Sequence, residues 1–369
     1  MKLLIDIGHP AHVHFFKNFI WKMEERGHHI HITCRDKEVT QDLLRFYGFK
    51  FDSRGHLRRG LVQKAYGILE ADYKIYCVAR RMKPDIFLGF HNPYITHVAK
   101  LMKKPSIVFT DTENVGIAST LTYSFADVIC TPSWFQESID RRKHVRFKGF
   151  KELAYLHPRY FTPDISVLED MEMAKTDRYI ILRFISWGAS HDIGLRGIKK
   201  GTELEFIRKL EAYGKVFITS ERALPKHLDS YRIAIPPHKI HSLLHYADLY
   251  VGEGGTMAVE AAILGTPSIH IESDASGRPT GESSGNFLQL RNVYNLLYFF
   301  STQESALQAS VNIFEMKDAK QIWRKRRDVL LDSTIDVTRW MLDFIETYPE
   351  SHDRLKQWKN NVVPSQDGI

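Results

Sequence analysis

Three histidines stand close together near the beginning of the chain, in the stretch DIGHPAHVHFF. His9, His12 and His14 follow the first apolar run, KLLIDI, where a strand would end and a helix would begin. An imidazole titrates near neutral pH, so His12, or else His9 or His14, is a candidate general base toward a hydroxyl group. Two alternatives stay open. The histidines can simply form the beginning of the helix and pack there, or they can bind a metal ion together with Asp6, which requires a loop because residues two apart do not share a helix face.

A second stretch, VGEGGTMAVEAAILGTP, has the composition of a phosphate-binding turn. An apolar run ends at Val251, glycines follow, and a helix is expected from Thr256 to Gly265. Glycine lets a ligand approach the backbone closely, and the free N–H groups of a helix start favour an anion such as phosphate. A carboxylate one turn into that helix suits the two hydroxyls of a ribose; a plain glycine turn with an exposed Glu is the alternative. The predicted nucleotide-sugar contacts are Gly254, Gly255, Thr256, Met257 and Glu260.

Two further segments place polar side chains after apolar runs of the second half. RFISWGASHD begins at the end of the run YIILRF, and TSER begins at the end of the run KVFITS. Because ligands of doubly wound sheets bind at the carboxyl ends of the strands, these side chains are expected beside the diphosphate or its sugar. Arg222 can neutralise phosphate charge by a bidentate contact, while ordinary capping or surface roles are the alternative. The candidates are Ser186, Ser190, His191, Ser220 and Arg222.

The apolar pattern around these residues predicts an α/β protein. Short continuous runs such as DIFLGF and SIVFTDT alternate with helical patterns, among them one over 12–26, which is typical of parallel sheets covered on both faces. The alternation lapses and then starts again, so we expect two Rossmann-like doubly wound domains facing a central cleft, over 1–155 and 176–345, with a linker over 156–175. The last helices are expected to pack back on the first domain, and 349–369 to form a polar tail.

These stretches resemble the sugar-nucleotide site of GT-B-fold enzymes, which include the peptidoglycan GlcNAc transferase and the UDP-GlcNAc 2-epimerases. The shared pattern is a turn of small residues, a Glu four or five residues into a helix, then Gly-x-Pro and a strand. The resemblance implies that Gly254 to Met257 face the diphosphate and that Glu260 holds the nucleotide ribose. The run His12-Val13-His14-Phe15 also resembles the end of the first loop of the transferase.

Over nearly its full length the chain is similar to a prokaryotic family known as a domain of unknown function. The segments HVHFFK, RFISWGASHD, TSER and TMAVEAAILGTP carry this resemblance, which implies a GT-B-like fold but no particular reaction. Two features depart from the better known enzymes. The first loop is IGHPAH rather than glycine-rich, and RFISWGASHD stands where the epimerases have a His-Arg-Glu-Asn signature.

The net charge of +7 is unevenly distributed over the 369 residues. A basic segment lies between Arg54 and Lys83, where a solvated helix face and a surface for phosphates or acidic lipids are both possible. GT-B enzymes with lipid-linked acceptors turn the N-terminal domain toward the membrane, so the resemblance implies peripheral contact with the membrane surface. The residues for this contact are Arg58, Arg59, Lys64, Arg80 and Arg81. In the same segment, apolar residues recur at helical spacing and are expected to belong to the core, namely Val62, Tyr66, Leu69, Tyr73 and Tyr76.

These observations predict a GT-B-type glycosyltransferase of the cell-envelope polysaccharide kind. Its donor would be a nucleotide-diphosphate sugar, a UDP-sugar first, and its acceptor a hydroxyl group, lipid-linked or on a polysaccharide. No metal or other cofactor is expected, since helix amides and Arg222 can stabilise the leaving diphosphate. The alternatives are a UDP-GlcNAc 2-epimerase-like enzyme, a metal-dependent hydrolase built on the N-terminal histidines, and a nucleotide-sugar-binding protein without catalysis.

The expected location is the cytoplasm, with the inner face of the membrane as a peripheral site. Three cysteines, at 34, 77 and 130, are far apart and odd in number, which argues against a disulfide framework. No run approaches the roughly 20 apolar residues of a membrane-spanning helix. No nucleic-acid partner is expected.

Overall fold

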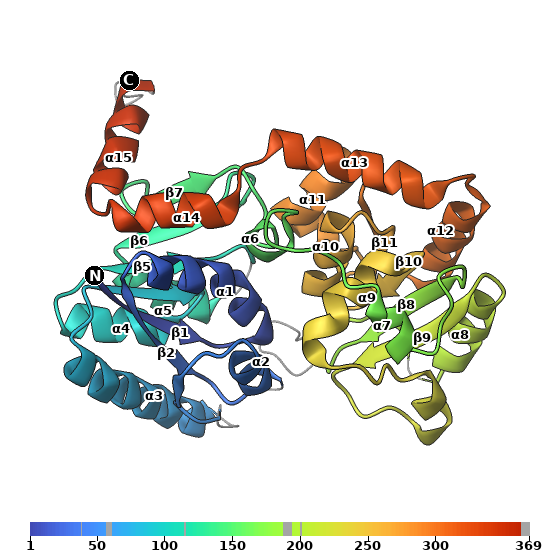
Figure 1. Cartoon of the computed structure of the whole chain (residues 1–369), viewed down its shortest axis with the longest axis horizontal. Helices are drawn as coiled ribbons and strands as arrows, with labels where there is room; N and C mark the ends of the chain where they lie inside the picture. The colour runs from blue at the N-terminus through green and yellow to red at the C-terminus, as the bar shows by residue number, and fades with distance from the viewer. Residues whose placement is uncertain (38, 57–60, 114–115, 187–193, 200, 363–369) are drawn as a thin grey trace. The chain divides into compact units, whose positions relative to one another are not determined.

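The computed structural model describes residues 1–362, except 38, 57–60, 114–115, 187–193 and 200 (Figure 1). The chain forms two compact units, each built around its own parallel sheet. Unit 1 comprises Met1–Ser133, Glu137–Tyr155 and Ile335–Ile369, and unit 2 comprises Trp134–Gln136 and Leu156–Thr334. The two parallel sheets confirm the α/β fold class that the alternating sequence pattern predicts.

The sheet of unit 1 has seven parallel strands in the order β3-β2-β1-β4-β5-β6-β7. The strands are β1 (Lys2–Ile7), β2 (His29–Cys34), β3 (Phe51–Ser53), β4 (Ile86–Phe90), β5 (Ser106–Phe109), β6 (Val128–Pro132) and β7 (His144–Phe147). Central strands such as β1 and β4 are buried along nearly their whole length, as continuous apolar runs require when helices cover both faces. The order reverses between β1 and β4, which makes their carboxyl ends the switch point of the sheet.

Helices cover both faces of this sheet, with α1 and α14 on one side and α3, α4 and α5 on the other (Figure 1). The helices of unit 1 are α1 (Pro10–Glu25), α2 (Thr40–Phe46), α3 (Leu61–Met82), α4 (Pro93–Leu101), α5 (Ile117–Phe125), α14 (Val337–Glu346) and α15 (Glu350–Val362). The short helix α6 (Leu153–Leu156) ends at the boundary of the unit. In α14, Val337 and Met341 are fully buried. Val337 packs so closely on Gly149 that a Cβ at Gly149 would lie 2.8 Å from its Cγ2.

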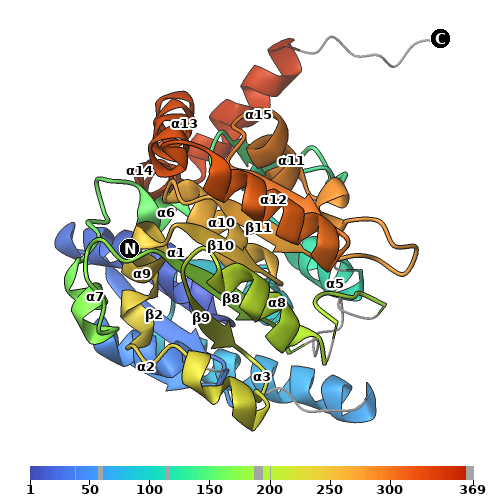
Figure 2. The same ribbon diagram turned by 90° about the vertical axis from the view of Figure 1, so that its right-hand side faces the viewer.

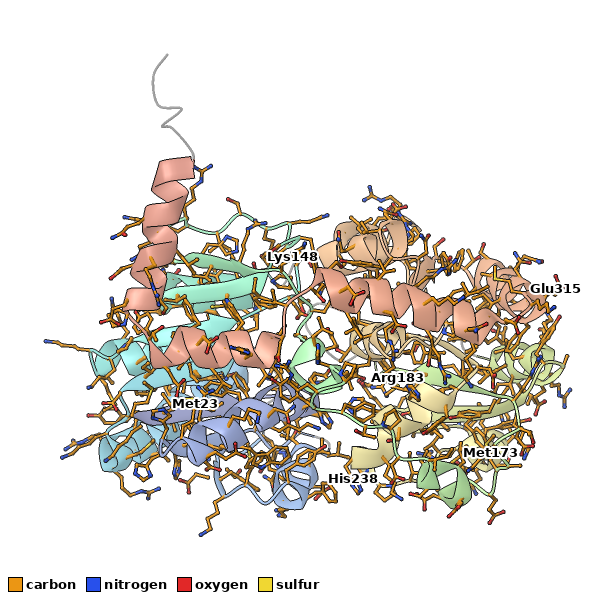
Figure 3. All side chains as sticks on the ribbon, turned by 45° about the horizontal axis from the view of Figure 1, so that its top comes forward. Met23, Lys148, Met173, Arg183, His238 and Glu315 are labelled. Carbon is orange, nitrogen blue, oxygen red and sulfur yellow. The ribbon has the colours of Figure 1, made fainter. Side chains whose placement is uncertain are left out.

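The sheet of unit 2 has five parallel strands in the order β12-β11-β10-β8-β9. The strands are β8 (Tyr179–Phe184), β9 (Lys215–Ser220), β10 (Leu249–Gly252), β11 (Ser268–Ile271) and β12 (Leu297–Phe300). A single parallel bridge between Ile218 and Arg232 extends the edge beyond β9. The switch point of this sheet lies between β8 and β10, and Figure 3 shows Arg183 on β8.

The helices of unit 2 also lie on both faces of their sheet, with α8 and α12 packed together on one of them (Figure 2). They are α7 (Ser166–Asp170), α8 (Glu203–Glu211), α9 (Ile240–Tyr246), α10 (Gly255–Ile263), α11 (Gly285–Asn292), α12 (Gln303–Glu315) and α13 (Ala319–Ser333). Three 3₁₀ turns complete the unit, η1 (Lys226–Tyr231), η2 (Pro237–Lys239) and η3 (Thr280–Ser283).

The described structure differs from the sequence expectation in its boundaries. The chain returns to unit 1 at Ile335, before the expected end of the second domain at 345. The expected linker over 156–175 belongs to unit 2 and contains α7, and the expected polar tail begins with α15. Of the last helices, α13 belongs to unit 2, whereas α14 and α15 belong to unit 1.

The apolar stripe of α3 is not the core element that its spacing predicts. Tyr66, Leu69 and Tyr73 are 59%, 68% and 67% exposed. The opposite face of α3 is the buried one, where Ile75 and Ala79 join the core around Leu4 and Phe87. The prediction was wrong for Tyr66, Leu69 and Tyr73, because helical spacing identifies an apolar face without showing that anything covers it. It holds for Tyr76, which is partly buried against this core, and the side chain of Val62 is not described.

Candidate functional site

The switch point of unit 1 gathers polar side chains from loops after several strands. His9 follows β1 and serves as the N-cap of α1, where its Nδ1 accepts a hydrogen bond from the N–H of Ala11 at 3.2 Å. Pro10 occupies the first turn, a position where its missing N–H costs nothing. His91, after β4, has a φ of +43°, in the left-handed region that non-glycine residues rarely adopt. Its Nδ1 lies 2.9 Å from Thr110 Oγ1, at the end of β5.

A buried ion pair holds this switch point together. Asp6, the fully buried residue near the end of β1, accepts from Arg54 Nε at 2.9 Å and from Thr33 Oγ1 at 2.6 Å. The Asn92 side-chain amide donates to the other oxygen of the same carboxylate, while its own oxygen caps α4. A buried carboxylate is stable when several donors surround it, as they do here. Asp6 is therefore engaged in the scaffold and not available as a metal ligand.

His12 lies in the first turn of α1 with its ring 4.8 Å from that of Phe90. Its Nδ1 is buried and has no hydrogen-bond partner among the described residues. Burial, followed by the positive charges of Lys151 and Lys37, holds the pKa of His12 well below 6.5. The ring is therefore neutral near neutral pH and keeps a lone pair, as a general base requires.

His14 points into a different environment from that of His12. It is buried, its ring stacks 5.5 Å from that of Tyr155, and its Nδ1 lies 3.3 Å from the hydroxyl of Tyr47. His9 and His12, by contrast, have ring centroids 5.8 Å apart. Among the residues that the structure describes, no three His, Cys, Asp or Glu side chains gather as a metal site would need. This geometry gives no support to the metal-dependent hydrolase.

Lys151 adds a buried cation to the same edge of unit 1. Its Nζ lies 2.6 Å from Asp111 Oδ2 and 3.2 Å from Glu152 Oε1. Burial alone would lower the pKa of Lys151, but the two carboxylates outweigh it and the pKa is raised. Lys151 is therefore charged, and the same Nζ lies 5.7 Å from the ring of Phe90, the ring beside His12. No spacing in the sequence connects Lys151 with His12, so only the fold reveals this grouping.

In unit 2 the glycine turn lies at the switch point between β8 and β10. Gly254 has a φ of +80°, and a Cβ there would come within 2.8 Å of Ile185. Glycine is required at this position for both reasons. Gly254 is also the N-cap of α10, and no side chain caps the helix. The amide groups of Gly255, Thr256 and Met257 thus begin a helix whose N-terminus has the polarity that favours an anion.

Glu260 lies one turn into α10 and is buried, with 5% of its surface exposed. Its Oε1 lies 3.1 Å from Nε2 of His241, which α9 contributes. The ring of Phe161 packs edge-on against His241 at 6.2 Å. The sequence pattern gives no sign of His241, because α9 and α10 become neighbours only in the folded unit.

Glu253, between the strand and the glycine turn, is a second buried acid that sequence reasoning missed. Its Oε2 accepts from the N–H of Ile185 at 2.9 Å and its Oε1 from the N–H of Ile198 at 2.7 Å. Burial raises the pKa of Glu253 to about 7, although both amide hydrogen bonds act in the opposite direction. The Glu253 side chain thus connects the turn before α10 with two other segments: Ile185, directly after β8, and Ile198, shortly before α8.

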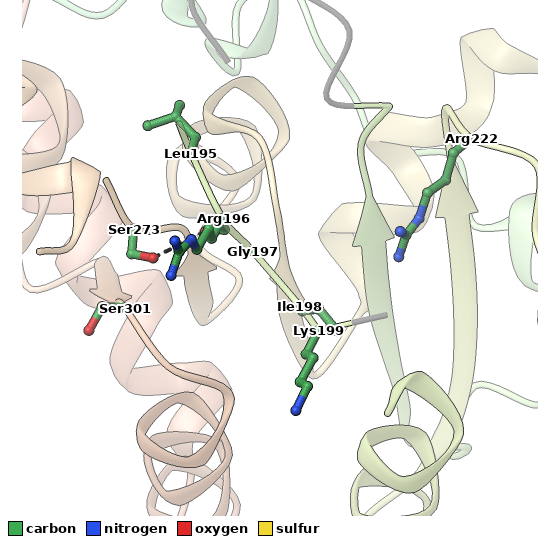
Figure 4. A pocket seen from close by; sticks show the side chains of 8 residues that line it. All are labelled: Leu195, Arg196, Gly197, Ile198, Lys199, Arg222, Ser273 and Ser301. Carbon is green, nitrogen blue, oxygen red and sulfur yellow. Dashed lines mark hydrogen bonds between the residues drawn. The ribbon is translucent and has the colours of Figure 1, made fainter. Parts of the chain in front are cut away.

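Unit 2 also contains a cavity of about 520 Å³, whose lining includes Ile198, the residue that donates to Glu253 (Figure 4). Its lining includes Arg196, Lys199, Arg222, Ser273 and Ser301. Arg222, one of the predicted residues, holds Glu203 at 3.2 Å and lies with its guanidinium 4.8 Å from the ring of Phe184. The cavity combines three cationic side chains with two hydroxyl groups, which is a composition suited to an anion.

The other predicted residues have varied positions. Ser220 forms a turn with Arg222, donating to its carbonyl oxygen at 2.8 Å, and Ser186 is exposed after β8. Ser190 and His191 lie outside the described residues, as do Arg58 and Arg59, and the side chain of Lys64 is not described either. Arg80 and Arg81 are exposed in the last turn of α3, where Arg81 pairs with Asp52 at 2.9 Å.

The comparisons with known proteins concern the family and the fold of the chain. Residues 1–276 match the DUF354 family, described as proteins of unknown function, and the chain belongs to this family. An uncharacterized protein of Methanocaldococcus jannaschii, MJ0665, is 26% identical over 274 residues, which cover 72% of this chain and 80% of that protein.

Two solved structures show the same architecture. The UDP-GlcNAc 2-epimerase of M. jannaschii, solved with UDP-GlcNAc and UDP, has a TM-score of 0.62 at 14% identity, over 89% of this chain and 99% of that one. The Streptomyces sp. SF2575 glycosyltransferase SsfS6 has a TM-score of 0.57 at 12% identity, over 92% and 99%. The chain therefore has a GT-B-like fold, shared with glycosyltransferases and UDP-GlcNAc 2-epimerases. Within the described part of the chain, no helix is long and apolar enough to span a bilayer.

Proposed function

We propose that this protein is a GT-B-type glycosyltransferase that binds a nucleotide-diphosphate sugar, most simply a UDP-sugar, in unit 2. The observation that carries the proposal is the start of α10, which lacks a side-chain cap and follows a glycine at φ +80°. The preceding Glu253 accepts a hydrogen bond from Ile198, which lines a cavity with three cationic side chains. Helix amides with no side-chain competitor are well suited to the two phosphates of such a donor.

The nucleotide would be oriented by the acid in the next turn of the same helix. Glu260 is proposed to accept hydrogen bonds from the ribose hydroxyls while His241 at 3.1 Å fixes its direction. Because the carboxylate is nearly buried, a ribose contact would be made in a low-dielectric setting where hydrogen bonds are strong. The remaining candidates, Ser186, Ser220 and Arg222, would lie near the diphosphate or its sugar.

The transfer itself needs a base and a stabilised leaving group. In the proposed reaction, the acceptor oxygen forms a bond to the anomeric carbon of the sugar, and the bond from that carbon to the diphosphate oxygen breaks. His12 takes the proton of the acceptor hydroxyl, and the amides of α10 with Arg222 stabilise the departing diphosphate. No metal ion has a part in these steps, so a chelator is expected to leave the activity unchanged.

A nucleotide-binding experiment tests the proposal. At 100 times its dissociation constant, UDP would stabilise the protein by about 2.7 kcal/mol, measured as a shift in thermal unfolding. Glu260→Gln is expected to weaken UDP binding about tenfold through loss of a charge-assisted hydrogen bond. Glu205→Gln, at an exposed position of α8, is the matched control and should bind UDP as the unmodified protein does. The absence of any UDP-induced shift would overturn the proposal.

The second candidate is an epimerase acting on the same class of nucleotide-sugar, favoured by the likeness to the UDP-GlcNAc 2-epimerase fold. Incubation with UDP-GlcNAc and no acceptor separates the two. If an epimerised sugar forms, the protein is an epimerase. If UDP-GlcNAc stays unchanged until an acceptor is added and is consumed only then, the protein is a transferase.

We also propose that unit 1 contacts an acidic lipid surface, where a lipid-linked acceptor would be found. An apolar groove of about 480 Å³ is formed by residues of α3, α4 and α5. Its lining includes Leu69, Leu101 and Phe125, together with one cation, Lys100. Leu69 and Leu101 are both 68% exposed, and Arg80 and Arg81 lie exposed at the end of α3. Apolar side chains with nearby cations are the combination that binds anionic membranes.

Vesicle sedimentation tests this surface. The protein is expected to sediment with phosphatidylglycerol vesicles and not with phosphatidylcholine vesicles, and the double variant Leu69→Ser, Tyr73→Ser should lose this binding. Val329→Ser, at a 61% exposed position of α13 in unit 2, is the control that should retain it. Equal sedimentation with both kinds of vesicle, or none with either, would contradict the proposal.

A further inference from the structure

The cavity of unit 2 is lined by three cationic side chains that differ in their partners. Arg222 already has an acidic partner in Glu203. Arg196 points toward Ser273, and Lys199, from the same segment, points in another direction (Figure 4). Neither side chain forms an ion pair with another described residue. Two cations without a carboxylate thus line a cavity of about 520 Å³, a volume typical of small-molecule sites.

Backbone hydrogen bonds anchor the segment that carries these cations. Arg196 and Ser273 exchange backbone hydrogen bonds at 2.9 and 2.8 Å. The N–H of Ile198 donates to Glu253 at 2.7 Å, and the N–H of Lys199 donates to Gln303 Oε1 at 3.1 Å. Hydrogen bonds at Arg196, Ile198 and Lys199 thus hold the backbone beneath the two cationic side chains. Such preorganisation lowers the entropy cost of binding a ligand.

The same anchors place the cavity next to the proposed diphosphate site. Ile198, which lines the cavity, is bonded to Glu253, and Glu253 directly precedes Gly254, the N-cap of α10. A group joined to a diphosphate at the start of α10 is therefore within reach of the cavity. The sugar is the part of the donor that is joined in this way.

We infer that the cavity binds an acidic group on the donor sugar, so that the substrate class is a nucleotide-diphosphate uronic acid. This inference rests on the proposed function and adds the chemical nature of the sugar. The Arg196 guanidinium presents two parallel N–H donors, which match the two oxygens of a carboxylate. The Lys199 ammonium adds a second charge, and the Ser273 and Ser301 hydroxyls can complete the hydrogen bonding of the ring.

Titration calorimetry with three nucleotides tests the inference on the whole chain. UDP, UDP-glucose and UDP-glucuronate share the same nucleotide, and the last two differ at one carbon of the sugar. UDP-glucuronate is expected to bind at least about tenfold more tightly than UDP-glucose, as a charge-assisted contact would provide. In the double variant Arg196→Gln, Lys199→Gln, UDP-glucuronate and UDP-glucose should bind with equal affinity.

Two controls separate the possible failures. Lys209→Gln removes an exposed lysine of α8 that pairs with Glu205, and it should keep the preference for UDP-glucuronate. If UDP and both sugars bind but with equal affinity, the acidic-sugar inference is overturned and the proposed function stands. If UDP itself does not bind, the proposed function fails and the inference fails with it. A raised salt concentration should weaken UDP-glucuronate more than UDP-glucose; the reverse would also overturn the inference.

Discussion

Two buried glutamates, Glu253 and Glu260, flank the beginning of α10 and have different tasks. Glu253 accepts two backbone N–H groups and holds a loop, whereas Glu260 pairs with the imidazole of His241. A carboxyl group whose two oxygens both accept backbone N–H groups holds the local structure, while one that faces a side chain can exchange partners with a ligand. The environment of each acid, rather than its type, thus makes Glu260 the better candidate for a ribose contact.

The first prediction concerns the proton state of His12. The neutral ring is expected to titrate below pH 6.5, because burial and the nearby charges of Lys151 and Lys37 disfavour the imidazolium. Lys37→Gln removes one of these charges and should move the titration midpoint of His12 upward, toward 6.5. Nuclear magnetic resonance of the ring protons measures this midpoint.

The matched control for the His12 titration is Lys50→Gln, at an exposed lysine of unit 1 that is not among the charges acting on His12. This variant should leave the midpoint unchanged. A midpoint of His12 at or above 6.5 in the unmodified protein would contradict the assignment of His12 as a base that is neutral at neutral pH. A downward shift in Lys37→Gln would contradict the electrostatic explanation.

Residue types and local spacing predicted some of the candidate site and missed the rest. Gly254 and the following helix could be predicted, since a strand, a glycine turn and a helix are contiguous in the sequence. Lys151, Arg196 and His241 could not, because each reaches its neighbours through tertiary packing and no local pattern marks it. His9 shows an intermediate case, in which the histidine and Pro10 together form an ordinary helix cap.

At the scale of elements, α3 shows why a periodic pattern is ambiguous. Its buried face consists of residues such as Ile75 and Ala79, whereas Tyr66, Leu69 and Tyr73 form a second apolar stripe that is exposed. A helix with two apolar faces fits both a core position and a surface that docks elsewhere. The parallel strands were easier to predict, since short continuous apolar runs are typical of strands that helices cover on both faces.

The second face of α3 gives an element-scale prediction about stability. Leu69→Ser should change the free energy of unfolding by less than about 0.5 kcal/mol, as substitutions at exposed positions do. Ile75→Ala, on the fully buried face, should cost about 2–5 kcal/mol through the lost contacts and the cavity. Denaturant titration measures both. A large cost for Leu69→Ser would mean that the stripe is covered in the native protein.

At the scale of the whole molecule, the two units repeat one arrangement. Each has a parallel sheet with a switch point, a loop that leaves the first strand into a helix, and a buried carboxylate that fixes the neighbouring loops: Asp6 in unit 1 and Glu253 in unit 2. The partners differ in charge. Asp6 is neutralised by Arg54, whereas Glu253 is bonded to neutral amides, which leaves its protonation open to pH.

The balance of buried titratable groups predicts how the stability of the molecule depends on pH. Burial lowers the pKa of His12 well below 6.5, that of His245 to about 4 and that of His270 to about 3. In the unfolded chain these rings take up protons near pH 6.5, so acidification below that value favours unfolding. Glu253 acts in the opposite sense. Its raised pKa of about 7 means that, as the pH falls, the native protein binds this proton before the unfolded chain does, which favours the native state.

On acidification, the unfolded chain binds three more protons at the histidines and the native protein binds one more at Glu253. The net difference of two protons should lower the free energy of unfolding by up to about 2.7 kcal/mol for each unit that the pH falls between 6.5 and about 5. Glu253→Gln removes the opposing group, so its curve should be steeper by about 1.4 kcal/mol per pH unit, whereas His245→Gln should be shallower by the same amount. Denaturant titrations at several pH values give these slopes. A Glu253→Gln slope no steeper than that of the unmodified protein would show that Glu253 is ionised in the native state throughout this range, and the loop it holds would then be insensitive to pH.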